Sequence, residues 1–157
     1  MKSTGTGVDF ELLVHEAVAS VDDPEYPGVS IVDLGLLETL LIDDAGGVRI
    51  GLVPTFSGCP ALAMIADDVR DAVAALEWVT AIEIEWLAAP AWSTDRVSED
   101  ARSVLSKEFT VAVQIGSSAK CPLCGEPTVE KSLFGPSRCR SVHRCEPCSE
   151  TIEVLRG

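Results

Sequence analysis

Pro54-Thr55-Phe56-Ser57-Gly58-Cys59-Pro60 is the stretch that decides the fold, because a strand pattern ends before it and a helix pattern begins after it. Residues 48–53 alternate as a half-buried strand does, and residues 61–76 repeat apolar side chains at helical spacing. The stretch is therefore predicted to be a strand-to-helix turn. Cys59 falls at or near the helix N-cap, and Pro60 suits the first helical position because its missing N–H would be unpaired there anyway.

This position gives Cys59 two interpretations. The unpaired N–H groups and the positive dipole end of the helix favour a thiolate, which would make Cys59 a nucleophile or a metal ligand. Alternatively, a small residue is simply what fits a crowded cap. The local pattern leaves both interpretations open.

Outward from this turn, helix and strand patterns follow one another along the chain. Residues 10–19 predict a helix with Asp9 as N-cap, and the Pro-containing residues 22–28 predict a loop that carries three carboxylates. The further expected elements are a strand at 36–42, a hairpin turn at 43–47, strands at 48–53 and 82–86, and helices at 61–76 and 98–105. This order predicts an α+β fold, in which a small three-stranded sheet carries helices on one face and is followed by a C-terminal zinc-ribbon-like module.

Charge divides the chain into an acidic body and a nearly neutral end. Residues 1–119 hold 6 Lys and Arg against 20 Asp and Glu, a balance of −14, and residues 120–157 hold 6 against 5, a balance of +1. An acidic body would be repelled by a phosphate backbone, which argues against nucleic-acid binding by the main domain. It fits a protein that docks on other proteins, and it fits equally a surface kept acidic for solubility.

The same change of composition predicts the domain boundaries. We expect a disordered tail at 1–8, an α+β domain at 9–109, a linker at 110–119 and a metal module at 120–157. The chain has no apolar run of about 18 residues and no apolar signal-peptide core at its start, so no membrane span is expected and the protein is predicted to be cytoplasmic.

The metal module carries the most specific local pattern. Cys121 and Cys124 form one C-x-x-C knuckle and Cys145 and Cys148 form another, with twenty residues between them. Each knuckle presents two thiolates from one tight turn, and two knuckles complete the tetrahedron that structural zinc prefers. So short a segment cannot bury enough apolar surface to fold alone, whereas structural zinc supplies roughly 10 to 16 kcal/mol.

Alternatives to this ligand set remain. Cys139 or His143 could replace one knuckle cysteine, and four cysteines could also hold an iron–sulfur cluster. Disulfides are the weaker interpretation for a chain without a secretion signal. Arg138, Arg140 and Arg144 make this region locally basic, which suits either a nucleic-acid patch or a patch that docks on an acidic partner.

An ordinary active site is not predicted. The sequence has no phosphate-binding glycine loop, and it holds two histidines, neither of which is placed by sequence next to Cys59. Four cysteines saturate zinc, whereas catalytic zinc needs an open position. The sequence therefore predicts a protein that is not an enzyme.

Seven short motifs occur in one order between residues 22 and 148. They are Asp23-Pro24-Glu25, Asp33-Leu34-Gly35, Thr55-Phe56-Ser57-Gly58-Cys59-Pro60, Pro90-Ala91-Trp92-Ser93-Thr94-Asp95, Cys121-Pro122-x-Cys124-Gly125, Phe134-Gly135 with Cys139, and Cys145-x-x-Cys148. Together they resemble the PaaD family, also called PaaJ. Its members are accessory proteins of the phenylacetyl-CoA epoxidase system of aerobic phenylacetate degradation.

The resemblance implies a function and a site. The family's N-terminal domain is similar to iron–sulfur assembly proteins that carry an Asp-Pro-Glu loop and one reactive cysteine. It implies that Asp23 and Glu25 are the loop acids and that Cys59 is the functional thiol, which would transiently hold iron or an iron–sulfur cluster. The implied role is maturation of a metallocentre, either in the di-iron oxygenase subunit or in the iron–sulfur reductase, which are then the expected partners.

Two departures from the family keep other functions open. His143 stands where members usually have an aromatic residue, and residues 151–156 lack the aromatic, lysine-rich ending expected of the family. The alternative function is a structural adaptor that bridges components of a ring oxygenase without thiol chemistry. A zinc-ribbon nucleic-acid binder is a third hypothesis, and it draws only on the basic region near residues 138–144.

Overall fold

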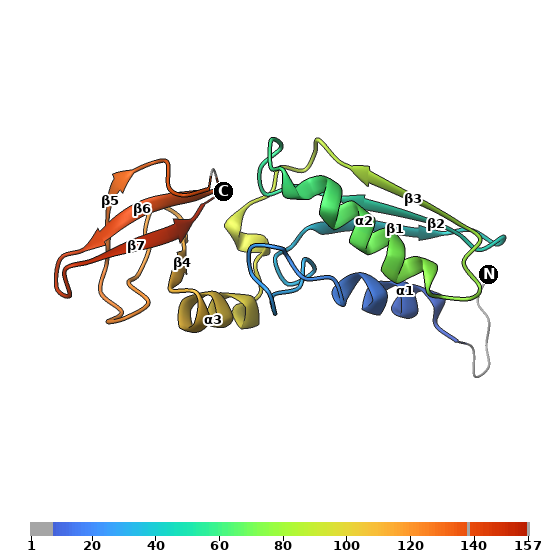
Figure 1. Cartoon of the computed structure of the whole chain (residues 1–157), viewed down its shortest axis with the longest axis horizontal. Coiled ribbons are helices and arrows are strands. Elements are labelled where there is room, and N and C mark those ends of the chain that lie inside the picture. The colour runs from blue at the N-terminus through green and yellow to red at the C-terminus, as the bar shows by residue number, and fades with distance from the viewer. Residues whose placement is uncertain (1–7, 138, 157) are drawn as a thin grey trace.

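The computed structural model describes residues 8–137 and 139–156, so Arg138 and the predicted tail at residues 1–7 lie outside the description (Figure 1). In chain order its helices and strands are α1 (Phe10–Ala19), β1 (Leu37–Ile42), β2 (Gly47–Leu52), α2 (Ala61–Ala74), β3 (Ala81–Trp86), the 3-10 helix η1 (Thr94–Arg96), α3 (Glu99–Glu108), β4 (Val111–Val113), β5 (Val129–Ser132), β6 (Arg140–Cys145) and β7 (Glu150–Leu155). The predicted α+β class is confirmed.

The first sheet has the strand order β1-β2-β3. β1 and β2 form an antiparallel hairpin, as predicted, and β3 lies parallel to β2 because α2 carries the chain across between them. Helices α1 and α2 lie side by side on one face of this sheet (Figure 1). Val14 and Val18 of α1 and Ile65, Val69 and Val73 of α2 are buried in the core against it.

Caps in the sequence begin the first and third helices where predicted. The Asp9 carboxylate accepts a hydrogen bond from the Leu12 N–H at 3.1 Å, and the Ser98 hydroxyl accepts one from the Ala101 N–H at 3.1 Å. Each bond satisfies an N–H that the first turn of a helix leaves unpaired. α3 continues to Glu108, three residues past the expected end.

The central turn has the predicted strand-to-helix form, with one difference of register. α2 begins at Ala61, so Pro60 stands at the N-cap rather than at the first helical position, and Cys59 lies one residue before the cap. Pro60 already has helical backbone angles, φ −63° and ψ −21°, and its side chain makes no capping bond. The Cys59 carbonyl accepts a hydrogen bond from the Leu62 N–H at 3.3 Å.

The second sheet has the strand order β4-β7-β6-β5 and corrects one prediction. The segment 110–119, expected as a linker, contains β4, which pairs in parallel with β7. Val111 and Ala112 are buried there, and Val111 joins Leu155 of β7 in the core that the first sheet also shares. Three apolar residues are too short a pattern to predict a strand from sequence, and burial between the two sheets makes it one.

The two sheets lie side by side along the long axis of the molecule, with α3 leading from one to the other (Figure 1). None of the helices in the described ranges combines the length and the apolar run needed to cross a bilayer.

Candidate functional site

Four cysteine thiols converge at one end of the second sheet. The Sγ atoms of Cys121, Cys124, Cys145 and Cys148 all lie within 4.8 Å of one another. Two of the pairs are 3.6 Å and 3.4 Å apart. Thiolates held about 2.3 Å from one zinc ion stand about 3.8 Å apart at the corners of a tetrahedron. The group therefore has the donor set and the size to hold one metal ion.

Tight turns at the two knuckles aim these thiols. In the first knuckle the Gly125 N–H donates to the Cys121 carbonyl at 2.8 Å, and Gly125 has φ +80°, which suits a residue without a Cβ. The Leu123 N–H points at the Cys121 Sγ at 3.4 Å. Burial acts to raise the pKa of Cys121, but N–H donors from the knuckle outweigh it and lower the pKa to about 7, which favours the thiolate that a metal needs.

His143 and Cys139, the two candidate replacement ligands, lie outside this group of four. His143 is buried in β6, where its Nδ1 is 2.9 Å from the Thr128 hydroxyl, and burial lowers its pKa. Cys139 directly precedes β6, whereas Cys145 ends it, so the length of the strand separates Cys139 from the four thiols. Its Sγ contacts the Ser137 hydroxyl at 3.2 Å.

The loop acids and Cys59 meet in a second place, between the two sheets. A cavity of about 20 Å³ is lined by Asp23, Glu25 and Tyr26 from the first loop, by Cys59 from the central turn, and by Cys139 from the second sheet. An open groove of about 460 Å³ shares Glu25, Cys59 and Cys139 with it. The structure thus brings together the three predicted residues of the first domain.

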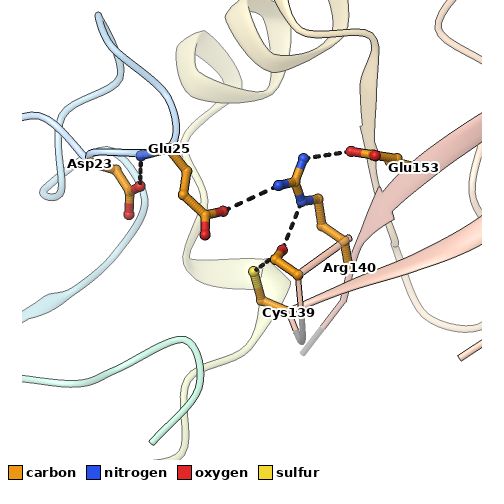
Figure 2. Close-up of polar contacts among 6 residues, drawn as sticks. Asp23, Glu25, Cys139, Arg140 and Glu153 are labelled. Carbon is orange, nitrogen blue, oxygen red and sulfur yellow. Dashed lines mark hydrogen bonds and ion pairs between the residues drawn. The ribbon is translucent and has the colours of Figure 1, made fainter. Parts of the chain in front are cut away.

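Asp23 organises its own loop. Its Oδ1 accepts a hydrogen bond from the Glu25 N–H at 2.8 Å, the usual bond of an Asx turn (Figure 2). Burial raises the pKa of Asp23, and the negative charge of Glu25 raises it further, while the N–H bond and Arg140 work against this increase. The Asp23 carboxylate therefore fixes the direction in which Glu25 leaves the loop.

Arg140 holds the Glu25 side chain. Its guanidinium lies between two carboxylates, donating to Glu25 at 3.3 Å and to Glu153, while its Nε donates to the Ser137 hydroxyl at 2.9 Å (Figure 2). The Arg140 side chain is only 16% exposed, and its guanidinium lies 5.4 Å from the centre of the Tyr26 ring. A residue of the second sheet thus positions an acid of the first loop.

This contact corrects the predicted basic patch. Of its three arginines, Arg138 lies outside the described residues and Arg140 is turned inward onto two acids. Arg144, whose side chain is 42% exposed, stands 4.0 Å from Glu146. The described part of this region therefore presents little unpaired positive charge to a nucleic acid.

Sequence reasoning missed Tyr26 entirely. The side chain is 3% exposed, its ring meets Phe109 edge-on at 5.4 Å, and its hydroxyl has no hydrogen-bond partner among the described residues. Burial raises its pKa, and the negative charges of Cys139, Glu25 and Asp23 raise it further. The one signal in the sequence was its place directly after Asp23-Pro24-Glu25.

Comparison with known proteins identifies the family. The chain is 32% identical over 155 residues to a protein of Escherichia coli (strain K12) whose provisional name makes it a component of 1,2-phenylacetyl-CoA epoxidase, and the alignment covers 91% of this chain and 92% of the relative. Residues 107–156 match the PaaD zinc beta ribbon domain. The chain belongs to the PaaD family. The resemblance drawn from the sequence motifs is confirmed.

The first part of this PaaD-family chain has a second set of relatives. Residues 13–86 match the family model described as iron-sulfur cluster assembly protein. The Fe-S protein maturation auxiliary factor YitW of Bacillus subtilis (strain 168) is 37% identical over 89 residues, covering 57% of this chain and 86% of the relative. A crystal structure of a domain of unknown function, DUF59, from Bacillus anthracis superposes with a TM-score of 0.59 at 32% identity, covering 63% of this chain and 93% of that one.

The relatives are thus named as an epoxidase component or as auxiliary factors of Fe-S protein maturation. Cys59, Asp23 and Glu25 all lie in the part of the PaaD-family chain that matches the assembly model, whereas Cys139 and Arg140 lie in the part that matches the zinc ribbon. The second cavity is therefore built from both parts.

Proposed function

We propose that this PaaD-family chain is a maturation factor of a phenylacetyl-CoA epoxidase and not itself an enzyme. In this role it holds iron or an iron–sulfur cluster in transit at Cys59 and passes it to a metallocentre of the cytoplasmic oxygenase complex. The observation that carries the proposal is the shared cavity, where a partly buried thiol and two loop acids face one another beside an open groove. Relatives named for Fe-S protein maturation match the same part of the chain.

The chemistry of the cavity suits a cargo that must leave again. A thiolate binds iron firmly, and a metal held by few protein ligands beside an opening can be taken over by a partner that offers more. Glu25 is already paired with Arg140, so its charge is balanced while the cavity waits for a cation. Asp23 and Glu25 then lower the electrostatic cost of bringing a cation to the thiol.

The four-cysteine group takes a different role in this proposal. We assign it to zinc, because four thiolates saturate the tetrahedral coordination that zinc prefers and leave no open position for catalysis. Metal binding there would supply the folding free energy that so small a sheet lacks. Zinc would therefore order β6, which carries Arg140 to the Glu25 loop.

A structural adaptor is the second candidate, and a surface feature favours it. The side chains of Leu133 and Phe134 are 51% and 71% exposed on the second sheet, next to the groove residues Gly135 and Pro136. Exposed apolar side chains of this size suit a protein partner. In this role the chain would bridge the oxygenase and reductase subunits, and the Cys59 thiol would be dispensable.

The discriminating experiment replaces the thiol and leaves the fold alone. Oxygenase and reductase subunits are produced with wild-type chain, Cys59→Ser, or the control Ser57→Ala, which changes an exposed residue of the same turn. We expect Ser57→Ala to match wild type and Cys59→Ser to leave the partners poor in iron and unable to epoxidise phenylacetyl-CoA. Normal iron content and activity with Cys59→Ser, alongside unchanged circular dichroism, would rule out the carrier and leave the adaptor.

A further inference from the structure

A second free thiol shares the cavity with Cys59. Cys139 lines both the cavity of about 20 Å³ and the adjoining groove, as do Cys59 and Glu25. The two thiols come from different sheets, with eighty positions between them in the chain, so the two units form opposite walls of one site. Both are free and partly buried.

The hydroxyl of Tyr26 is an independent sign that this cavity takes a ligand. It is buried at 3% exposure and has no hydrogen-bond partner in the described part of the chain, which is costly for a polar group. Its pKa is raised by burial and then by the charges of Cys139, Glu25 and Asp23, so it lies close to the groups that line the cavity. A thiolate or metal-bound ligand there would give the hydroxyl an acceptor.

We propose that Cys59 and Cys139 together bind one soft or borderline divalent cation, of the class of Fe²⁺, in the cavity between the two sheets. This inference rests on the proposed function, because the ion is the cargo that the maturation factor carries. Each thiol gives up its proton to solvent as its sulfur bonds the ion, so one divalent cation replaces two protons and no charge is added to the site. Tyr26 donates its hydroxyl hydrogen to one of the metal-bound sulfurs.

The size of the cavity selects a single ion over a cluster. Its volume of about 20 Å³ is close to that of one water-sized sphere, which needs about 10 to 15 Å³ on the same measure. Two thiols select soft or borderline metals over Mg²⁺ or Ca²⁺, which prefer oxygen ligands. In the described part of the chain, the four ribbon cysteines are the compact ligand group, so the ion draws Cys59 and Cys139 together from opposite walls.

The surroundings of Cys139 fit a ligand that is exchanged rather than permanent. Its Sγ contacts the Ser137 hydroxyl at 3.2 Å, and that hydroxyl also accepts the Arg140 Nε bond at 2.9 Å. Metal binding would exchange the weak Sγ contact for a metal–sulfur bond and leave the Arg140 bond to hold the turn. The ribbon would thus supply half of the cargo site as well as a docking surface.

The test uses Co²⁺ as a spectroscopic probe on the full chain, prepared without oxygen and with zinc at one ion per chain. Thiolate-to-cobalt absorption reports cobalt–sulfur bonds, and competition with a chromophoric chelator gives the affinity. We expect one Co²⁺ per wild-type chain, with zinc retained. Cys59→Ser and Cys139→Ser should each weaken binding by more than the roughly 10- to 100-fold that loss of an outer-shell partner costs, and Tyr26→Phe should weaken it by about that amount.

Controls separate a lost ligand from a lost fold. Ser57→Ala should bind Co²⁺ as wild type does, and Cys139→Ala should behave as Cys139→Ser does. All variants should keep their zinc and their circular dichroism spectrum. A variant that fails either check is replaced by alkylation of the wild-type thiols with iodoacetamide, which should block Co²⁺ binding without a change of sequence.

The outcomes distinguish this inference from the proposed function. Wild-type binding by Cys139→Ser with loss only in Cys59→Ser would overturn the shared site and leave Cys59 as a lone carrier. Loss in both variants, combined with full partner activation by Cys59→Ser, would support the shared site and overturn the carrier role. Absence of Co²⁺ binding by wild type, or a cobalt signal that persists in the double variant, would overturn the shared site.

Discussion

Replacing Arg140 tests whether the second sheet holds the Glu25 loop. The guanidinium is 16% exposed, and its partners Glu153 and Glu25 are 33% and 34% exposed, so water screens both pairs only in part. A hydrogen bond to a charged group contributes about 1.5 to 3 kcal/mol, and the longer Glu25 pair about 0.5 to 1 kcal/mol. Allowing for partial exposure, Arg140→Ala should lower the free energy of unfolding by about 2 to 3 kcal/mol.

Urea unfolding of the zinc-saturated chain, combined with two double-mutant cycles, divides this loss. The cycle with Glu153→Gln should return about 2 kcal/mol and the cycle with Glu25→Gln about 0.5 to 1 kcal/mol. The matched control is Arg144→Ala on the same strand, whose partner Glu146 is 63% exposed, with an expected change below about 0.5 kcal/mol. A Glu25 coupling below about 0.3 kcal/mol, the usual limit of additivity, would show that Arg140 does not hold the loop.

Three further predictions concern metal, pH and backbone geometry. A strong chelator should remove the metal of the four-cysteine site and melt β5, β6 and β7, seen by circular dichroism, while fluorescence of the three tryptophans, all before residue 93, stays unchanged. In metal-loaded Cys59→Ser, alkylation of Cys139 should have its pH midpoint above 9.0, because burial raises the pKa of this thiol; the matching stability is present below pH 9 and is lost as pH rises through the raised pKa. Gly35→Ala should cost about 2 to 4 kcal/mol in urea unfolding, because φ is +80° and a Cβ would meet Arg96, whereas Gly116→Ala, with φ +61° and open space, should cost about 1 kcal/mol.

The first sheet was predictable because its signals are local. Helix caps at Asp9 and Ser98, the hairpin turn and the helical spacing of α2 each depend on neighbours a few positions away. The two C-x-x-C knuckles are local in the same sense, since each fixes two thiols within one turn. What such patterns cannot supply is the partner of a strand, and β4 was missed because its pairing with β7 joins residues about forty positions apart.

The shared cavity was half predicted for the same reason. Cys59 was singled out by its place before a helix, and Asp23 and Glu25 by a loop motif, all within the first 60 residues. Cys139 was assigned instead to the neighbouring knuckles, because closeness in sequence was the only measure of closeness available. In the structure the length of β6 separates Cys139 from those knuckles and delivers it to Cys59.

Arg140 shows why such a contact cannot be predicted from charge alone. Its bond to Glu25 joins residues 115 positions apart, and the sequence offers 25 acids and 12 basic residues from which to choose a pair. Runs of arginine are usually solvated, so a surface patch was the ordinary interpretation. Burial decides otherwise: once β6 packs beside the first loop, a guanidinium at 16% exposure must find carboxylates, and Glu25 and Glu153 are the two that the fold brings to it.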